Sequence, residues 1–382
     1  MNKIRFENIH IQKGRIDLDY EDTLDQKGNL YFELNVPVSP RNDLIALALS
    51  TLCGQKYDAI HIGLSISQET KGAIESFCRA EVSVEGISDA SASKANRNNV
   101  TLNFSGGFDS LAALALMPRE TQLVSMDFGG PFQREMPFIE RFDTAICRTN
   151  IIDTDFRRNS WMFMGIGSIL LRDYLQTDFN TFGSILGASV ISDSRRAASN
   201  TSPAPFKEAG MENAPYVMTL TEAATAKVAM QANPDMIRAS LNSLANPKEE
   251  KRYRKQLLVQ AVAKRHGLDI EIDAVPTPSS HRFKWGENFQ ADFITLYLMK
   301  HLDQDTQLTV GEIPESVHKL VESSSFDFYE RYNPNFITHF PKELRAGLLQ
   351  RLNDFDLLPY TENDWVEFSR VREMLKIYYN IV

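Results

Sequence analysis

A short run of small and polar residues, "SGGFDS" at positions 105–110, offers the clearest chemistry in this chain. It directly follows the apolar segment "VTLNF". Adjacent glycines let the backbone approach a ligand closely and direct successive N–H groups at one point. A helix that begins near Asp109 adds the positive end of its dipole, and the hydroxyls of Ser105 and Ser110 add donors. A carboxylate at this place also suits a metal ion that bridges phosphate oxygens. The run therefore predicts a pyrophosphate cradle.

The same residues also fit a plain structural role, which stays open at this point. A Gly-Gly turn between a strand and a helix is common, and Asp109 or Ser110 would then serve only as a helix cap. The turn lacks the Gly-Lys-Ser/Thr of a Walker A loop, the G-x-G-x-x-G of a dinucleotide site and the G-x-S-x-G of a serine hydrolase. It therefore differs from all three of those classes.

The elements that position this turn alternate between strand and helix from residue 100 onward. Strands are predicted over 100–105, 121–128, 149–156 and 179–189, and helices over 109–117, 136–146 and 159–175. Alternation of this kind predicts βαβ units with a parallel sheet, and ligands of such sheets lie at the carboxyl ends of the strands. The turn at 105–110 falls at one of these ends.

The regions before and after this α/β segment differ from it in pattern. Residues 1–97 show period-two alternation with one or two helical stretches, and predict a small α/β domain that ends in a polar stretch at 88–99. Residues 276–382 carry apolar side chains at helical spacing, which predicts a mainly helical region. We therefore expect three parts, an N-terminal domain over 1–97, a ligand-binding α/β domain over 98–275 and a helical region over 276–382.

Composition is typical of a globular protein of 382 residues with two or three domains, because 43% of positions are hydrophobic and 24% charged. A net charge of -9 argues against a nucleic-acid partner. The N-terminus lacks the apolar core of a signal peptide, and the apolar run 161–171 is too short to span a bilayer, so we expect a cytoplasmic protein without a membrane partner. Three widely spaced cysteines indicate neither a disulfide framework nor a paired-cysteine metal site.

The run at 105–110 resembles the S-G-G-x-D-S signature of the PP-loop, or N-type, ATP pyrophosphatases. The chain is most similar to the 7-cyano-7-deazaguanine synthases of that superfamily, over roughly residues 100–194. This similarity includes "VSMDFGGPFQRE", "RNSWMFMGIGSILL" and "FGSILGASVISDS". The resemblance implies an adenine nucleotide alpha hydrolase-like (HUP) core. It also implies cleavage of ATP between the α- and β-phosphates, transfer of adenylate to a carboxylate or carbonyl oxygen, and displacement of AMP by a nitrogen nucleophile.

The resemblance implies ATP and Mg²⁺ as cofactors and gives roles to particular residues. The phosphates and the metal ion are expected at Ser105, Gly106, Gly107, Asp109 and Ser110, with Asp109 as the metal ligand. The adenine is expected at Met126, Asp127 and Phe128, with Gly187 passing close beneath the nucleotide.

Adenylyl transfer also needs cations, because negative charge develops on the α-phosphate and on the leaving pyrophosphate. Arg195 and Arg196 in the polar segment 191–214 are candidates, so we expect the catalytic set to be Asp109, Ser110 and these two arginines. A solvated pair of loop arginines is an equally open reading.

The chain departs from the deazaguanine synthases downstream of the similar region. Their four-cysteine zinc site corresponds to residues near 240–255, which contain no cysteine, so zinc is not expected. Their threonine-lysine-x-glutamate helix start appears here with Glu222 in place of the lysine, and Lys227 one turn later is a candidate replacement. The charge run "KEEKRYRK" at 248–255 is typical of a solvated helix face.

These features lead to one main expectation and two alternatives. The main expectation is an ATP-dependent, AMP-forming ligase whose acceptor is a small molecule or a protein end. The terminal regions would then serve a homodimer or protein partners. The first alternative is an ATP-binding sensing or assembly component of a multi-protein system, such as a bacterial defence system. The second, a tRNA-thiolating enzyme, is weakened by the acidic charge and the absence of a suitably spaced cysteine pair.

Overall fold

The structure, a computed structural model, describes residues 1–89, 98–187, 202–302 and 309–381. The chain divides into two compact units, and each is described by itself. The chain passes from the first unit to the second within the glycine-rich run, between Ser105 and Gly106. The first unit comprises Met1–Ser105, Arg119–Thr181 and Thr201–Ala214, and the second comprises Gly106–Pro118, Phe182–Asn200 and Pro215–Val382.

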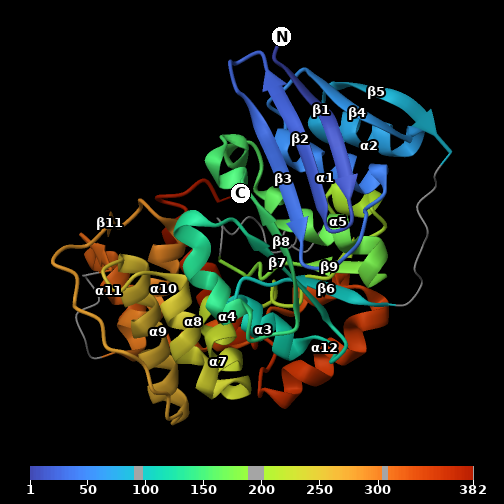
Figure 1. Cartoon of the computed structure of the whole chain (residues 1–382). Helices are drawn as coiled ribbons and strands as arrows, with labels where there is room; N and C mark the ends of the chain where they lie inside the picture. Colours follow the sequence, from blue (N-terminus) through green and yellow to red (C-terminus); the bar gives the residue numbers. More distant parts are fainter. Residues whose placement is uncertain (90–97, 188–201, 303–308, 382) are drawn as a thin grey trace. The chain divides into compact units, whose positions relative to one another are not determined.

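A ten-stranded sheet forms the centre of the first unit, with the strand order β10-β9-β6-β7-β8-β3-β2-β1-β4-β5 (Figure 1). The pairs β1–β2, β2–β3 and β3–β8 are antiparallel, and the other six neighbouring pairs are parallel. The α/β class with a mostly parallel sheet is therefore confirmed. The strands are β1 (Lys3–Gln12), β2 (Arg15–Asp22), β3 (Lys27–Leu34), β4 (Ala59–Ser67), β5 (Glu81–Ser88), β6 (Val100–Asn103), β7 (Gln122–Asp127), β8 (Thr144–Thr149), β9 (Phe179–Thr181) and β10 (Glu212–Asn213).

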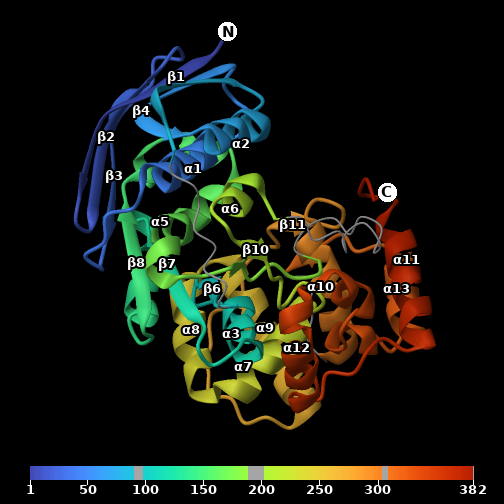
Figure 2. The ribbon, with the colours of Figure 1, turned by 90° about the vertical axis from the view of Figure 1, so that its right-hand side faces the viewer.

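Helices of the first unit cover one face of the N-terminal strands. Alternation on β1 buries Ile4 and Phe6 on this face, while Lys3 and Arg5 remain exposed on the other. Figure 2 shows α1 and α2 against β4, and both contact that strand. The helices of this unit are α1 (Asn42–Cys53), α2 (Gln68–Cys78), α4 (Met136–Ile139), α5 (Ile166–Leu175) and α6 (Ala204–Glu208), with 3₁₀ turns η1 (Gly130–Glu135), η2 (Ile151–Asp153), η3 (Phe156–Arg158) and η4 (Trp161–Gly165).

The N-terminal strands continue the same sheet that holds the strands of the central segment. Phe32 of β3 pairs with Thr149 of β8, so backbone hydrogen bonds join the expected N-terminal domain to the expected ligand-binding domain. The division into units therefore differs from the expected boundary after residue 97. The period-two alternation along 1–97 predicted that strands occur there but carried no information about which later strand would pair with β3.

Several elements predicted after β7 differ from the structure in extent or type. The helix predicted over 136–146 ends as α4 at Ile139, and β8 already begins at Thr144, where a strand was predicted only from residue 149. β8 lies between β7 and β3 and forms a ladder with each, which outweighs the helical spacing of its apolar residues. The helix predicted over 159–175 starts as the 3₁₀ turn η4, and the strand predicted over 179–189 ends as β9 at Thr181.

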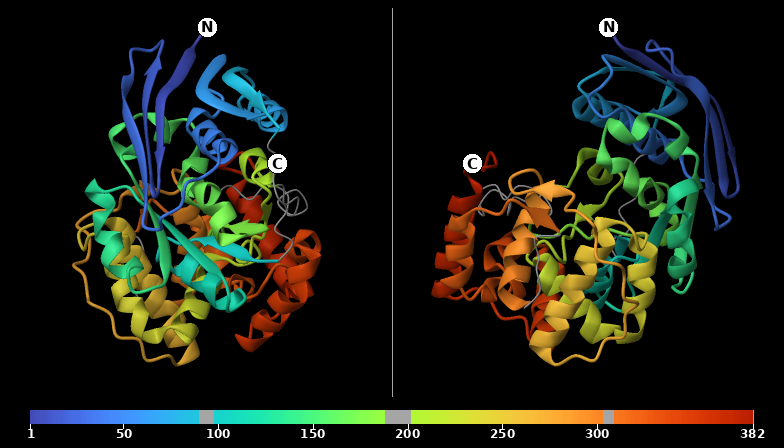
Figure 3. Two further views of the ribbon diagram at one scale, coloured as in Figure 1. Left: turned by 45° about the vertical axis from the view of Figure 1, so that its right-hand side comes forward. Right: turned by 90° about the vertical axis from the view of Figure 1, so that its left-hand side faces the viewer.

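The second unit is largely helical, and α7 lies at its centre in contact with α3, α9 and α10. Ala223, Ala226 and Val228 of α7 are fully buried because helices surround them. The right-hand view of Figure 3 shows the orange and red C-terminal helices packed together, and α11 contacts both α10 and α13. The helices are α3 (Phe108–Leu116), α7 (Glu222–Ala232), α8 (Ile237–Leu244), α9 (Glu250–His266), α10 (Phe289–His301), α11 (Glu315–Glu322), α12 (Lys342–Asp354) and α13 (Glu362–Leu375), with turns η5 (Pro234–Met236), η7 (Asp327–Glu330) and η8 (Pro334–His339) and short strands β11 (Phe283–Lys284) and β12 (Val310–Gly311).

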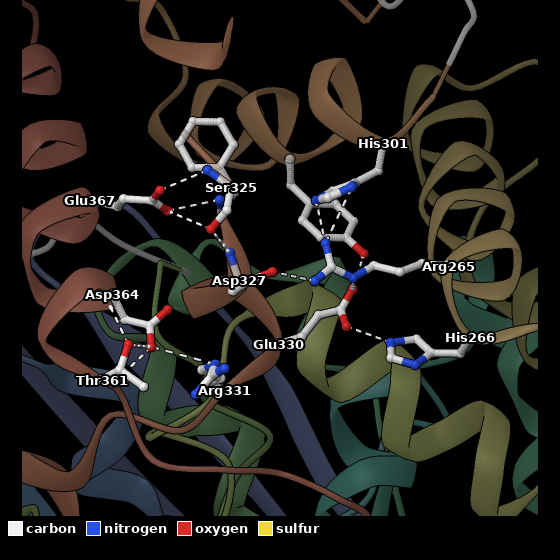
Figure 4. A network of polar contacts seen from close by, with 12 residues as sticks. Arg265, His266, His301, Ser325, Asp327, Glu330, Arg331, Thr361, Asp364 and Glu367 are labelled. Carbon is white, nitrogen blue, oxygen red and sulfur yellow. Dashed lines mark hydrogen bonds and ion pairs between the residues drawn. The ribbon is translucent and has the colours of Figure 1, made fainter. Parts of the chain in front are cut away.

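A polar network ties the carboxyl end of α9 to η7 and α10 (Figure 4). The buried carboxylate of Glu330 accepts hydrogen bonds from His266 and from the hydroxyl of Tyr297, and Arg265 Nε lies 3.2 Å from it. Arg265 also pairs with Asp327. We call Arg265, His266, Tyr297, Asp327 and Glu330 the Glu330 network. Among the described residues, the structure contains no helix with the length and apolar character that crossing a membrane requires.

Candidate functional site

The glycine-rich turn opens α3 through a backbone conformation that suits glycine. Gly106 has φ +73, in the left-handed region where a side chain is strained. Gly107 is the N-cap of α3, and no side chain caps the helix there. The structure therefore gives neither Asp109 nor Ser110 the capping role of the structural alternative. The buried hydroxyl of Ser110 donates to the carbonyl of Gly107 at 3.0 Å.

Asp109 lies in the first turn of α3 and points toward the start of α7. Thr225 Oγ1 of α7 donates a hydrogen bond of 2.6 Å to Asp109 Oδ1. Burial raises the pKa of Asp109, the Lys255 ammonium opposes this shift, and the Glu222 carboxylate adds to it. Asp109 as a whole residue is partly exposed to solvent. The hydrogen bond from Thr225 therefore holds the carboxylate in one orientation.

Glu222, in the first turn of α7, is the centre of a buried group of charges. Lys255 Nζ lies 2.5 Å from Glu222 Oε1, and Arg254 Nη1 lies 3.7 Å from Glu222 Oε2. Burial alone would raise the pKa of Glu222, but the charges of Lys255 and Arg254 outweigh it and lower the pKa. Likewise, burial would lower the pKa of Lys255, but Glu222 and Asp109 raise it. The Glu222 carboxylate and the Lys255 ammonium therefore each favour the charged form of the other.

The second turn of α9 supplies both cations of this group. Arg254 Nε donates to Glu250 Oε1 at 2.9 Å, one turn earlier on the same helix. The Lys255 ammonium also lies 5.4 Å from the ring centroid of Phe108, the residue between Gly107 and Asp109. We call Asp109, Glu222, Thr225, Arg254 and Lys255 the Asp109 cluster. It joins the first turns of α3 and α7 to α9.

Two further contacts fix the glycine-rich turn within the second unit. The buried hydroxyl of Ser240, on α8, donates to the carbonyl of Gly106 at 2.6 Å. Gly183 lies against the first turn of α3, where a Cβ would come within 3.1 Å of the Ser110 nitrogen. Gly187, which the resemblance places beneath a nucleotide, has φ +91 and lies against the ring of Phe293. Gly183 is thus the glycine of this segment that approaches the turn.

The sequence-predicted site residues divide between the two units. Gly106, Gly107, Asp109 and Ser110 lie together in the second unit, whereas Ser105, Met126, Asp127 and Phe128 belong to the first. Arg195 and Arg196 lie outside the described residues.

In the first unit, the residues expected to bind adenine make contacts of their own. Asp127 accepts from Arg148 Nε at 2.8 Å and from the backbone N–H of Gly129 at 2.9 Å. The ring of Phe128 contacts Phe132 and Phe163 edge-on. The adenine role of Asp127, Phe128 and Met126 therefore stays a prediction.

The prediction of a solvated helix face over the charge run at 248–255 is wrong. Arg252, Arg254 and Lys255 are buried because α9 packs against α7, α8 and α10. Glu222, which pairs with both Arg254 and Lys255, lies far away in the sequence, so the run gave no local sign of it. Lys227, the candidate replacement for a lysine at 222, donates instead to the carbonyl of Asp356 at 3.1 Å. Lys255 is the lysine that meets Glu222.

The Asp109 carboxylate suits a Mg²⁺ ion that also binds phosphate oxygens. Mg²⁺ prefers hard oxygen ligands and is usually held by one or two carboxylates, with waters and substrate phosphates filling its other positions. Asp109 offers such a carboxylate, oriented by Thr225. Among the described residues no group of three histidine, cysteine, aspartate or glutamate side chains is arranged to hold a metal ion by itself. A metal ion at Asp109 would therefore depend on the ligand's own oxygens.

Comparisons of this chain with protein-family models, with curated proteins and with solved structures gave no match. The geometry of the site and the resemblance of the glycine-rich run are therefore the basis for a proposal about function.

Proposed function

We propose that this chain is an ATP-dependent, AMP-forming enzyme of the PP-loop type with an adenine nucleotide alpha hydrolase-like core. One observation carries the proposal: the Gly106–Gly107 turn opens α3 one residue before Asp109, which lies in a buried cluster of charges. A turn that serves only to connect a strand and a helix needs no such cluster. The helix dipole of α3 and the N–H groups of the turn favour an anion here, and the Asp109 carboxylate favours its metal ion.

In the proposed reaction, a carboxylate or carbonyl oxygen of the acceptor attacks the α-phosphorus of ATP. The bond between that phosphorus and the oxygen bridging to the β-phosphate breaks, and pyrophosphate leaves with the electron pair. A nitrogen nucleophile then attacks the adenylated carbon and displaces AMP. The acceptor is a small molecule or a protein end.

Each residue of the turn has a part in this proposal that follows from its contacts. Gly106 and Gly107 present backbone N–H groups to the phosphates, and Ser240 holds the Gly106 carbonyl on the opposite side of the peptide. Asp109 would hold Mg²⁺, which when bound neutralises phosphate charge and so favours departure of pyrophosphate. Thr225 keeps the Asp109 carboxylate in one orientation. Ser110 supports the turn through its bond to Gly107.

The test is the position at which ATP is cleaved. Purified protein is incubated with Mg²⁺ and α-³²P-labelled ATP, alone and with a metabolite extract, and AMP is resolved from ADP. The proposal expects labelled AMP from the unchanged chain and none from Asp109→Ala, with Lys264→Met, at an exposed lysine near the carboxyl end of α9, as a control. Formation of ADP in place of AMP would contradict the α–β cleavage chemistry.

One observation favours a second candidate, an ATP-binding sensing or assembly component without group transfer. Glu222 places a buried carboxylate where the resemblance leads to a lysine, so the chemistry at the start of α7 differs from that of the deazaguanine synthases. This candidate expects stoichiometric binding of ATP with neither AMP nor ADP formed. Comparing turnover with equilibrium binding of labelled ATP separates the two proposals.

A further inference from the structure

The Asp109 cluster contains a buried hydrogen-bond donor without a protein acceptor. The Arg254 side chain is 9% exposed, and its Nη1 has no hydrogen-bond partner among the described residues. The nearest carboxylate to this atom in an ion pair is Glu222, at 3.7 Å, which is too long for a hydrogen bond. Buried donors are normally paired, and an unpaired one in a charged side chain carries a large desolvation penalty. Arg254 Nη1 therefore makes no hydrogen bond to the described residues, although Glu222 Oε2, itself without a hydrogen-bond partner among them, lies 3.7 Å away.

Lys255, the second cation of the cluster, pairs with the same carboxylate. Its ammonium has three N–H groups, and its ion-pair partner among the described residues is a single carboxylate, Glu222. The remaining side of the ammonium faces the Phe108 ring at the start of α3. Lys255 thus lies beside the glycine-rich turn itself, and its charge acts on Asp109.

The position of the two cations fits a phosphate-bearing ligand better than a purely structural ion pair. Burying charges costs folding free energy, and apolar side chains of similar volume would often fill such a space at lower cost. Here the charges lie where α3 and α7 both begin, so two helix dipoles direct their positive ends at the same place. A phosphate group offers several acceptor oxygens, enough for the guanidinium, the ammonium and the N–H groups of the turn together.

We propose that Arg254 and Lys255 of α9 bind the phosphate groups of the ligand, with Glu222 holding both side chains in position. This inference rests on the proposed function. It assigns the side-chain cations that contact the phosphates to α9. The unpaired Nη1 of Arg254 donates to a phosphate oxygen, and the Lys255 ammonium bridges Glu222 and a second oxygen. Glu222 is a positioning residue, because it acts through the two cations.

The experiment measures binding of Mg²⁺-tripolyphosphate to the full chain by isothermal titration calorimetry, which requires neither adenine recognition nor turnover. Lys255→Met and Arg254→Gln should each weaken binding by about tenfold or more, the loss expected for one charge-assisted hydrogen bond. Lys255→Arg keeps the charge on a larger, planar group and should lose less affinity than Lys255→Met. Lys264→Met removes an exposed lysine near the carboxyl end of the same helix, and its affinity should be unchanged.

Circular dichroism on every variant ensures that only folded protein is compared. Arg254→Gln keeps the test decisive if Lys255→Met does not fold, because it leaves the ion pair between Lys255 and Glu222 in place. Unchanged affinity in the folded cation variants would overturn the inference, as would absence of tripolyphosphate binding by the unchanged chain. AMP formation with unchanged affinities would overturn the inference alone, whereas binding with the expected losses but without AMP would overturn only the proposed enzyme activity.

Discussion

Each end of α9 belongs to a cluster of charged side chains. The two clusters differ in how far protein groups satisfy their hydrogen bonds. In the Glu330 network, the carboxylate receives donors from His266, Tyr297 and Arg265 (Figure 4). In the Asp109 cluster, Lys255 shares one carboxylate with Arg254, whose Nη1 has no hydrogen-bond partner among the described residues. The first arrangement is closed by protein groups alone, whereas the second keeps donors for a ligand.

This difference separates charges that hold the fold from charges that serve a site. A satisfied network in a region of low dielectric constant fixes the geometry of its members, and loss of one member leaves the others unpaired. An unsatisfied cluster costs stability until a ligand completes it. We therefore expect changes in the Glu330 network to alter stability, and changes in the Asp109 cluster to alter binding.

The largest effect on stability is expected from the closed network. Glu330→Gln removes the charge that His266 and Arg265 share, and should lower the free energy of unfolding by about 3 kcal/mol, as measured by urea denaturation. Its affinity for Mg²⁺-ATP should stay that of the unchanged chain. A loss of stability below about 1 kcal/mol would remove the distinction between the two ends of α9.

The second largest effect on stability is expected when the ligand binds at the Asp109 cluster. Mg²⁺-ATP at one hundred times its dissociation constant should raise the free energy of unfolding by about 2.7 kcal/mol, because it binds the folded state alone. The same increase should occur in Glu330→Gln and be absent in Asp109→Ala. Thermal unfolding with and without the nucleotide checks this. Equal stabilisation of Asp109→Ala would place the ligand elsewhere.

A smaller effect is expected from the hydroxyl that orients Asp109. Thr225→Val keeps the shape of the side chain but removes its 2.6 Å hydrogen bond to Asp109 Oδ1. A hydrogen bond to a charged group contributes about 1.5 kcal/mol or more, so affinity for Mg²⁺-ATP should fall by roughly tenfold. Calorimetric titration measures this affinity. Thr295→Val, in the buried part of α10, is the matched control. Unchanged affinity would show that Asp109 needs no orienting partner.

The smallest effect concerns pH at the closed end of α9. Burial, followed by the charge of Arg265, lowers the pKa of His301 to about 4 from its usual 6.5. Between these values the unfolded chain takes up a proton that the folded chain does not, so this residue lowers stability as pH falls from 6.5 toward 4. Solvent screens the half-buried ring, and we expect a loss of about 1 kcal/mol.

Urea denaturation at several pH values, compared with His301→Gln, measures that contribution. The variant should lose less stability than the unchanged chain over the same interval. Identical pH profiles for the two proteins would show that His301 does not titrate in this way.

Prediction from sequence worked where the signal was local. The strand before the glycine-rich run and the helix after it were predicted to within a few residues, because β-propensity, two glycines and helical spacing all lie within the segment itself. β8 was missed because its ladders to β7 and β3 depend on strands elsewhere in the chain. For the same reason, Asp109 was predicted as a site residue from the sequence, but the cations of its cluster were not. Nothing in the sequence around Lys227 or Lys255 indicates which of the two pairs with Glu222.

The most direct test of the central claim is calorimetric titration of α,β-methylene ATP with Mg²⁺, a nucleotide that α–β cleavage cannot consume. We expect one site per chain, with affinity unchanged in Glu330→Gln and reduced by about tenfold or more in both Asp109→Ala and Lys255→Met. Equal affinity of the unchanged chain and these two variants, or no binding by the unchanged chain, would contradict a phosphate site at the open end of α9.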